Sequence, residues 1–301
     1  QLMALSRSVD VQFIDRWGGP GELDMDIIRQ VGGANAIEGL LGFTGQGVRG
    51  EVFDTELLVT HREFKKPPLI HSTAVSGSGG YHGSSCYSIN FAQGLERAVR
   101  GMLPDAQGIF FLYQESTQFG GTKSRYDMNR QLTDPEGPYR AVFQTSSVGS
   151  SLVRTYTTIS AEVDDYLLKS PLLSTQSQSN AGSQDSRPQS WAKNIVSVGA
   201  IYHLNTAARG DDKWNFSGST GPAPEGRIKP DLAFFYDSIA AASGNGEGNY
   251  TNFGGTSAAT PMTGGHFGVL FQMWHEGVWA GHGRKGDVFE SRPNMATAKA
   301  L

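Results

Sequence analysis

The stretch GGTSAATPMTGG at residues 254–265 decides the fold. Its two leading glycines precede Thr256 and Ser257, and an apolar run follows as far as Trp274. Glycine tolerates the backbone angles of a tight turn. Pro261 fits only near a helix start, where the first four amides have no intrahelical partner. The stretch therefore predicts a tight turn that places Ser257 at the beginning of a buried helix.

A serine in that position has a chemical advantage. The backbone N–H of Ser257 would point out of the helix, and the helix dipole favours negative charge there. Both features suit the oxyanion that forms when a serine attacks a carbonyl group. An isolated Gly-Thr-Ser is more simply interpreted as a helix cap, but the whole string favours a nucleophile. Gly264 and Gly265, each costing about 1 kcal/mol against Ala, predict close packing of this helix against a sheet.

Short apolar runs elsewhere precede Gly- or Ser-rich loops and helix-like patterns. They lie at 49–54, 107–113, 141–145, 172–176 and 195–201. This alternation is typical of an α/β fold with a mostly parallel sheet covered by helices, with working residues at the carboxyl ends of the strands. The sequence shows no convincing linker, so we expect one domain over residues 1–301.

The composition excludes several classes of protein. Hydrophobic residues make up 38% of the 301 residues and charged residues 18%, which is globular and not disordered. The net charge of −4 argues against a nucleic-acid partner, and no apolar run approaches the roughly 18 residues of a membrane span. The 39 glycines suit binding of an extended ligand along the main chain, although a loop-rich surface explains most of them. Cys86 is the only cysteine, so no intrachain disulfide can form.

The string GTSAATPMTGG resembles the nucleophile motif of the subtilases, the subtilisin-like serine proteases, in which G-T-S-x-A-x-P surrounds the catalytic serine. Ala258 stands where that family usually has Met. The resemblance implies a subtilisin-like three-layer fold and a serine endopeptidase that forms an acyl-enzyme on Ser257. It also implies an Asp and then a His upstream of the serine.

Two upstream segments match those expectations. VRGEVFDT at 48–55 resembles the family strand that ends in Asp-Thr-Gly, and it assigns Asp54 as the acid that orients the base. Glu56 replaces the glycine and places a second carboxylate nearby. HGSSC at 82–86 resembles the H-G-T-x-x-x-G motif that opens a helix, with Ser in place of Thr, and it assigns His82 as general base. Cys86 follows one turn later, where we expect a buried small residue and not a reactive thiol.

The resemblance also assigns an oxyanion donor. QSQSNAG at 176–182 occupies the place of the family's A-A-G-N-x-G, and KNIVSVGA at 193–200 is similar to A-K-N-x-I-x-V-G-A. The second match sets the alignment and assigns Asn180. RGMLPDA at 100–106 and GRIKPDLA at 226–233 match further family segments.

The same alignment predicts the substrate cleft. An extended peptide would add as a strand beside segment 146–150, and it would be held by main-chain hydrogen bonds. The polar residues before Asn180 replace the usual Ala-Ala-Gly, so substrate preference should not be copied from a familiar subtilisin. The residues expected to line the cleft are Gly120, Ser147, Val148, Gly149, Ser177, Gln178 and Ser179.

The resemblance implies a secreted, extracellular monomer that acts on an extended polypeptide and binds a propeptide or protein inhibitor. It also implies structural calcium, which prefers several oxygen ligands. Acidic clusters occur at Asp10–Asp26, Asp164–Asp165 and Asp211–Asp212, but none has a specific loop spacing. Solvated charged faces are the favoured interpretation of these clusters, so the calcium ligands stay unassigned.

The carboxyl end, PNMATAKAL at 293–301, predicts a helix that is packed on the domain and is still helical where the chain stops. We expect the natural precursor to continue beyond Leu301. The resemblance is closest to the larger alkaline bacterial subtilases, which carry a C-terminal β-barrel domain.

Two alternatives use the same residues. A peptide ligase or macrocyclase would employ the same triad with an amine in place of water. A non-catalytic binding module would keep only the fold and the cleft, although intact triad residues together with Asn180 argue against it.

Overall fold

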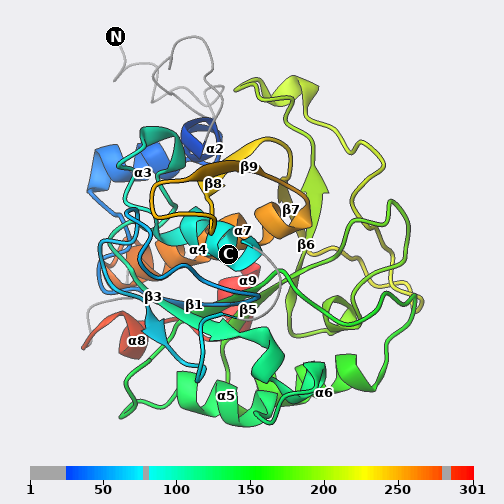
Figure 1. Cartoon of the computed structure of the whole chain (residues 1–301). Coiled ribbons are helices and arrows are strands. Elements are labelled where there is room, and N and C mark those ends of the chain that lie inside the picture. The colour runs from blue at the N-terminus through cyan, green and yellow to red at the C-terminus, as the bar shows by residue number, and fades with distance from the viewer. Residues whose placement is uncertain (1–24, 77–80, 280–285) are drawn as a thin grey trace.

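The computed structural model describes residues 25–76, 81–279 and 286–301. In these ranges the chain forms a seven-stranded parallel sheet with the strand order β2-β3-β1-β4-β5-β6-β7 and a separate antiparallel pair, β8-β9 (Figure 1). The strands of the main sheet are β1 Arg49–Asp54, β2 Leu69–Ile70, β3 Gln107–Leu112, β4 Phe143–Ser146, β5 Leu173–Ser177, β6 Val196–Ile201 and β7 Leu232–Phe235. The pair consists of β8 Ile239–Ala242 and β9 Tyr250–Phe253.

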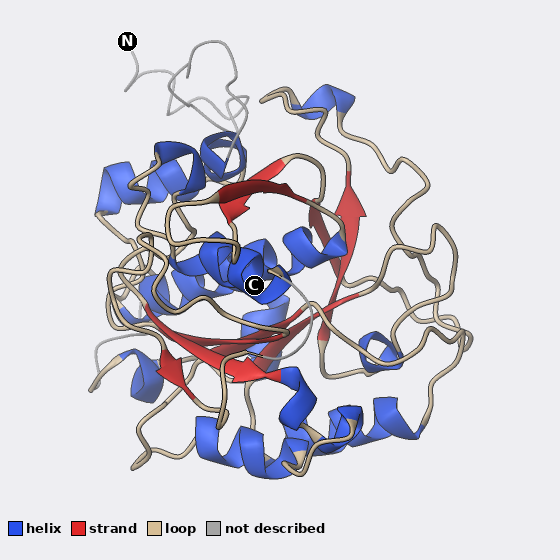
Figure 2. Cartoon of the chain, viewed as in Figure 1, coloured by secondary structure: helices blue, strands red, loops and turns tan. Residues whose placement is uncertain are grey.

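Helices cover both faces of the sheet. Figure 2 shows α4 and α7 on one face and α5 and α6 on the other, with the sheet between them. The α-helices are α2 Met25–Val31, α3 Ala34–Leu41, α4 His82–Phe91, α5 Arg125–Leu132, α6 Thr158–Lys169, α7 Thr256–His275, α8 Val288–Ser291 and α9 Met295–Ala300. Short 3₁₀ helices lie at η1 Arg97–Val99, η2 Tyr113–Glu115, η3 Thr117–Phe119, η4 Pro188–Trp191 and η5 Arg209–Asp211. The three-layer α/β prediction is confirmed, and each apolar run became a parallel strand.

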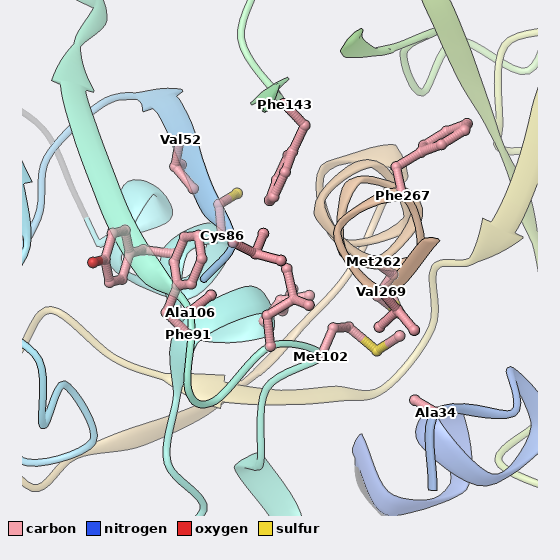
Figure 3. Close-up of a cluster of buried hydrophobic side chains, with 14 of the residues drawn as sticks. Ala34, Val52, Cys86, Phe91, Met102, Ala106, Phe143, Met262, Phe267 and Val269 are labelled. Carbon is pink, nitrogen blue, oxygen red and sulfur yellow. The ribbon is translucent and has the colours of Figure 1, made fainter. Parts of the chain in front are cut away.

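Buried apolar clusters hold the three layers together, and the two largest lie on opposite faces of the sheet. The larger cluster lies between the sheet and α4 and α7, and it includes Val52, Phe143 and Met262 (Figure 3). The smaller lies under α5 and α6 and includes Ile109 and Leu167. Burial of these side chains is the main stabilising contribution to the fold, and it fixes both the strand ends and the helix starts that carry the site.

Helix α7 differs from the sequence prediction at Pro261. The proline is the sixth residue of the helix and not one of the first four, so it lies inside the hydrogen-bonded region. Because proline has no N–H, the carbonyl oxygen of Ser257, four residues earlier, has no intrahelical donor. That oxygen instead accepts hydrogen bonds from two side chains of the site, as described below.

The predicted carboxyl-terminal helix is shorter than expected. It begins at Met295, because the Asn294 side chain caps it by accepting a hydrogen bond of 2.8 Å from the Thr297 amide. Ala298 is fully buried, and Lys299 donates to the carbonyl of Ile195 at 2.9 Å. The helix is therefore packed on the rest of the fold. In the described ranges, no helix has both the length and the apolar character needed to cross a membrane.

Candidate active site

Asp54 and His82 form a hydrogen-bonded pair at the carboxyl edge of the sheet. Asp54 ends β1 and is fully buried. Its Oδ1 accepts the Thr55 amide at 2.7 Å and lies 2.6 Å from His82 Nδ1. A proton on Nδ1 satisfies this bond, which leaves Nε2 of the neutral ring free to accept a proton.

The surroundings of His82 hold its ring in place. His82 is the first residue of α4, and its ring lies edge-on to Phe253 with the ring centres 5.1 Å apart. Gly83 is required because a Cβ atom there would lie 2.4 Å from the carbonyl oxygen of Glu56. This close approach brings the start of α4 against the end of β1. The side chain of His82 stays 32% exposed, so its outer edge is open to substrate.

Burial and charge act in opposite directions on His82. Burial alone would lower the pKa of its imidazole, but the charge and hydrogen bond of Asp54 outweigh burial and raise that pKa above 6.5.

The pKa of the Cys86 thiol is set mainly by burial. Burial, reinforced by the nearby Asp54 charge, raises the pKa of the thiol to about 11. The thiol is therefore neutral at physiological pH, in agreement with its predicted role as a buried small residue.

Ser257 is the second residue of α7 and is half-buried. It follows Gly255, whose φ of 76° and ψ of 177° form a turn that favours glycine. Its carbonyl oxygen, released by Pro261, accepts Cys86 Sγ at 3.4 Å and Ser147 Oγ at 3.0 Å. These two bonds attach the serine to α4 and to the predicted substrate segment.

A general base and its nucleophile are expected to lie within hydrogen-bond reach, but the described residues show no direct hydrogen bond between His82 and Ser257. Cys86 instead joins the two, since its sulfur also lies 3.7 Å from His82 Nδ1. Catalytic hydrogen bonds are often long in a free enzyme and tighten when substrate binds. Asp54, His82 and Ser257 therefore lie in one region of the fold, but the hydrogen bond between His82 and Ser257 is not formed.

Two unused N–H donors lie beside Ser257. The Asn180 side chain is oriented by its own oxygen, which accepts the Thr256 amide at 2.8 Å and the Thr256 hydroxyl at 3.1 Å. Its Nδ2 therefore faces away from that contact. In the described structure neither this Nδ2 nor the Ser257 amide donates to another protein group. Such a pair can bind a negatively charged oxygen.

The two predicted cleft walls continue from neighbouring strands. Ser147, Val148 and Gly149 follow β4, and Ser177 ends β5. The Gln176 side chain donates to the carbonyl of Val148 at 2.9 Å and thereby links the walls.

The remaining cleft residues are placed as follows. Gln178 is fully buried and donates to Ser186 Oγ at 3.0 Å, so its side chain supports a loop behind the wall. Ser179 has a positive φ of 116°. Gly120 is exposed at the end of η3.

Sequence reasoning missed three parts of this site. Thr256 orients Asn180, the predicted cleft residue Ser147 also donates to the carbonyl of Ser257, and Phe253 contacts the imidazole ring. Only Pro261 offered a signal, because a proline inside a helix leaves a carbonyl for other donors. The other contacts depend on loop paths that no local pattern encodes.

One cluster of His, Cys, Asp and Glu side chains among the described residues could approach a metal ion, and it does not suit calcium. Asp54, His82 and Cys86 could together approach a metal ion, but calcium prefers oxygen ligands and this set offers nitrogen and sulfur. His82 Nδ1 and Asp54 Oδ1 are moreover already bound to each other. The described residues thus assign no calcium ligands.

The acidic clusters also differ from the sequence interpretation. Asp164 is buried and not solvated, since it accepts the amides of Lys193 and Asn194 at 2.8 and 2.7 Å. Asp165 binds Lys169, and Asp212 binds Arg209, each at 2.6 Å. The Asp10–Asp26 cluster lies outside the described side chains.

The fold and the comparisons with known proteins together define a serine protease. A family model described as the subtilase family matches residues 57–282, which is well over half of the chain. The chain therefore belongs to the subtilase family. A search of curated proteins finds no match.

Solved structures show the same fold at low sequence identity. The prenylagaramide maturation protease PagA is 17% identical with a TM-score of 0.61, covering 86% of this chain and 84% of PagA. A cold-adapted subtilisin-like serine proteinase is 15% identical with a TM-score of 0.59, covering 86% and 82%. A mutant of the protease domain of PatA is 16% identical with a TM-score of 0.57, covering 83% and 87%.

Proposed function

We propose that this subtilase is an endopeptidase that cleaves polypeptides through an acyl-enzyme on Ser257. The observation that carries the proposal is the buried Asp54–His82 pair of 2.6 Å next to a serine at a helix start. In this arrangement the acid fixes the imidazole tautomer, and the base is directed toward the substrate side.

The reaction follows from the positions of these groups. His82 Nε2 takes the proton of Ser257 Oγ while the oxygen attacks the peptide carbonyl. The oxyanion accepts hydrogen bonds from the backbone amide of Ser257 and from Nδ2 of Asn180. His82 then gives the proton to the leaving amine, which departs as the C–N bond breaks. Water, activated by the same imidazole, hydrolyses the ester and restores the serine. Asp54 stays ionised and stabilises the imidazolium.

We propose that substrate lies as an extended strand against Ser147–Gly149, facing Ser177–Ser179 and Gly120. The amides of Val148 and Gly149 support this, because they donate to no protein group among the described residues and extended peptides pair with exposed backbone irrespective of their side chains. A propeptide or protein inhibitor would occupy the same cleft. We further propose a secreted monomer on the strength of family membership.

We propose that any stabilising calcium is bound away from Asp164–Asp165 and Asp211–Asp212, whose carboxylates already bind protein groups. Melting curves with calcium and with a chelator test this proposal. A calcium-dependent increase in the melting temperature that persists in Asp165→Asn supports it, and loss of the increase in that variant contradicts it.

Release of fragments from a denatured protein tests the proposed function. The wild-type chain should cleave it, an active-site serine inhibitor should stop cleavage, and Ser257→Ala should be inactive while folded. Ser170→Ala, at the end of α6 and away from the site, is the matched control. Ligation of added peptide amines without hydrolysis would indicate a ligase. Binding of peptide without any turnover would indicate a binding module.

A further inference from the structure

Arg125 is a buried cation without an ionic partner in the described part of the chain. It is the first residue of α5 and only 4% exposed. Its Nη2 donates to Gln144 Oε1 at 2.6 Å and to the Tyr166 hydroxyl at 3.1 Å. Its Nε and Nη1 atoms are buried with no hydrogen-bond partner. Unpaired polar atoms of this kind are costly, and a buried guanidinium is normally paired.

The surroundings of Arg125 do not balance its charge. The rings of Phe53 and Tyr166 lie under the guanidinium at 4.2 and 5.1 Å, which offsets only part of the cost of burial. Gln144 connects Arg125 to Glu51 through a bond of 2.6 Å, but Glu51 is already paired with His71 at 2.6 Å. The N-terminal end of α5 adds positive potential. Among the described residues, no anion therefore balances the charge of Arg125.

Arg125 lines a narrow pocket beside the proposed substrate segment. The buried part of the pocket is closed, because its side chains pack so tightly that not even a water molecule fits between them. This part is lined by Phe53, Arg125, Ser146, Tyr166, Gln176 and Gln189. The half-buried members of the pocket, Gln118, Phe119 and Val148, form the mouth.

Val148 is the central residue of the segment that we expect to pair with substrate. A peptide bound there would pass directly over the pocket mouth. Glu162 lies close to this mouth, where its carboxylate accepts a hydrogen bond of 3.4 Å from the Gln118 side chain.

We propose that this pocket binds the side-chain carboxylate of an Asp or Glu in the peptide substrate, with Arg125 as a specificity-determining residue. The inference rests on the proposed function, since it requires a peptide beside Val148. The substrate carboxylate supplies the missing anion and accepts hydrogen bonds from donors that are otherwise unused. The side chains at the mouth, on η3, must move apart to admit it. The outcome is a protease that selects acidic residues near the cleaved bond.

Paired fluorogenic peptides test this proposal. Each pair carries Glu or Gln at one of the residues preceding the cleaved bond, and kcat/KM is measured for both. At one position the wild type should have a kcat/KM for the Glu peptide roughly tenfold or more above that for the Gln peptide, because a charge-assisted hydrogen bond is stronger than a neutral one. Arg125→Met should remove that preference while cleavage of the Gln peptide persists. Arg130→Met, at an exposed residue of the same helix, should keep it.

Two results would overturn the inference. One is a wild type with no preference for Glu at any position, and the other is a folded Arg125→Met that retains the preference. If Arg125→Met does not fold, Arg125→Gln, which preserves a hydrogen-bonding side chain, replaces it. If neither variant folds, the Glu and Gln peptides measured with the wild type still test whether the enzyme prefers an acidic residue. Failure of the wild type to cleave any peptide would instead count against the proposed function.

Discussion

The proposed peptide hydrolysis depends most on Asp54, because its carboxylate orients His82. Its Oδ1 binds Thr55 and His82, whereas its Oδ2 is buried with no partner among the described residues. The negative charge is therefore stabilised chiefly by the imidazole. This concentration of charge raises the pKa of His82 in spite of burial.

Activity should consequently depend on a deprotonation above pH 6.5. His82 acts as a base only when neutral, so kcat/KM should rise with pH through the raised pKa of that residue. The same shift contributes folding stability that is fully present below pH 6.5 and lost as pH rises through the folded-state pKa. A pH–rate profile for a peptide ester measures the acid limb. Full activity already at pH 6 would contradict this account.

Replacing Asp54 provides a second test of the same charge. Asp54→Asn should move the midpoint of the acid limb downward and reduce kcat by about 10⁴, the size known for this change in another serine protease triad. Stopped-assay kinetics across pH measure both effects. An unchanged midpoint would mean that another group titrates.

Cys86 should be chemically inert. Burial raises the pKa of its thiol to about 11, so little thiolate exists at pH 8. Iodoacetamide should leave the native enzyme unlabelled and active, while denatured protein should take up one label, as intact mass would show. Rapid labelling of the native protein with loss of activity would contradict the predicted structural role.

Asn180 should act in the transition state more than in substrate binding. Asn180→Ala should lower kcat by about 10²–10³, the range known for the equivalent donor in a subtilisin, with little change in KM. Asn180→Asp serves as a comparison of similar size that replaces the donor by a carboxylate. An effect confined to KM would assign Asn180 to substrate binding instead.

Among the elements, α7 is central to the site, because it presents Ser257 and packs between the sheet and α4. Gly264 faces the sheet strands β4 and β5, whereas Gly265 faces α4 and Met102 and not the sheet. A Cβ on Gly265 would lie 2.4 Å from Met102 Cβ and 2.6 Å from Asn90 Oδ1. A Cβ on Gly264 would meet its nearest atom, in Thr145, at 3.3 Å. The two adjacent glycines thus have different reasons to be small, although the sequence treats them alike.

Alanine substitutions separate these reasons. Gly265→Ala should destabilise the protein by about 1–3 kcal/mol because backbone or core atoms must move. Gly264→Ala should change the free energy of unfolding by less than about 1 kcal/mol, since improved helix propensity offsets a mild crowding. Urea unfolding measures both variants. Equal effects would show that helix propensity, and not packing, governs this face of α7.

Across the whole molecule, the sheet and the residues at its carboxyl edge were predictable from the sequence, because local apolar patterns mark the strands and parallel topology brings their ends together. The apolar runs predicted the parallel strands, and parallel strands bring Asp54 and the substrate segments to one edge of the sheet. Ser257 and His82 were recognisable because the strings around them, GTSAATPMTGG and HGSSC, resemble two subtilase motifs.

Features that depend on tertiary packing were not predictable. The sixth-position proline, the burial of Asp164 and the unpaired Arg125 arise from contacts between segments distant in sequence. The length of the last helix depended on its cap at Asn294. The predicted continuation beyond Leu301 into a β-barrel domain stays a prediction.

Covalent labelling tests the central claim most directly. Treating the enzyme with phenylmethylsulfonyl fluoride and mapping the adduct by mass spectrometry should identify one sulfonylated residue, Ser257, with loss of activity in proportion to labelling. Asp54→Asn should slow the labelling, because the base is no longer oriented. A fully inactivated enzyme that carries the adduct on another residue, or an enzyme that stays active with Ser257 modified, would contradict the assignment of Ser257 as the nucleophile.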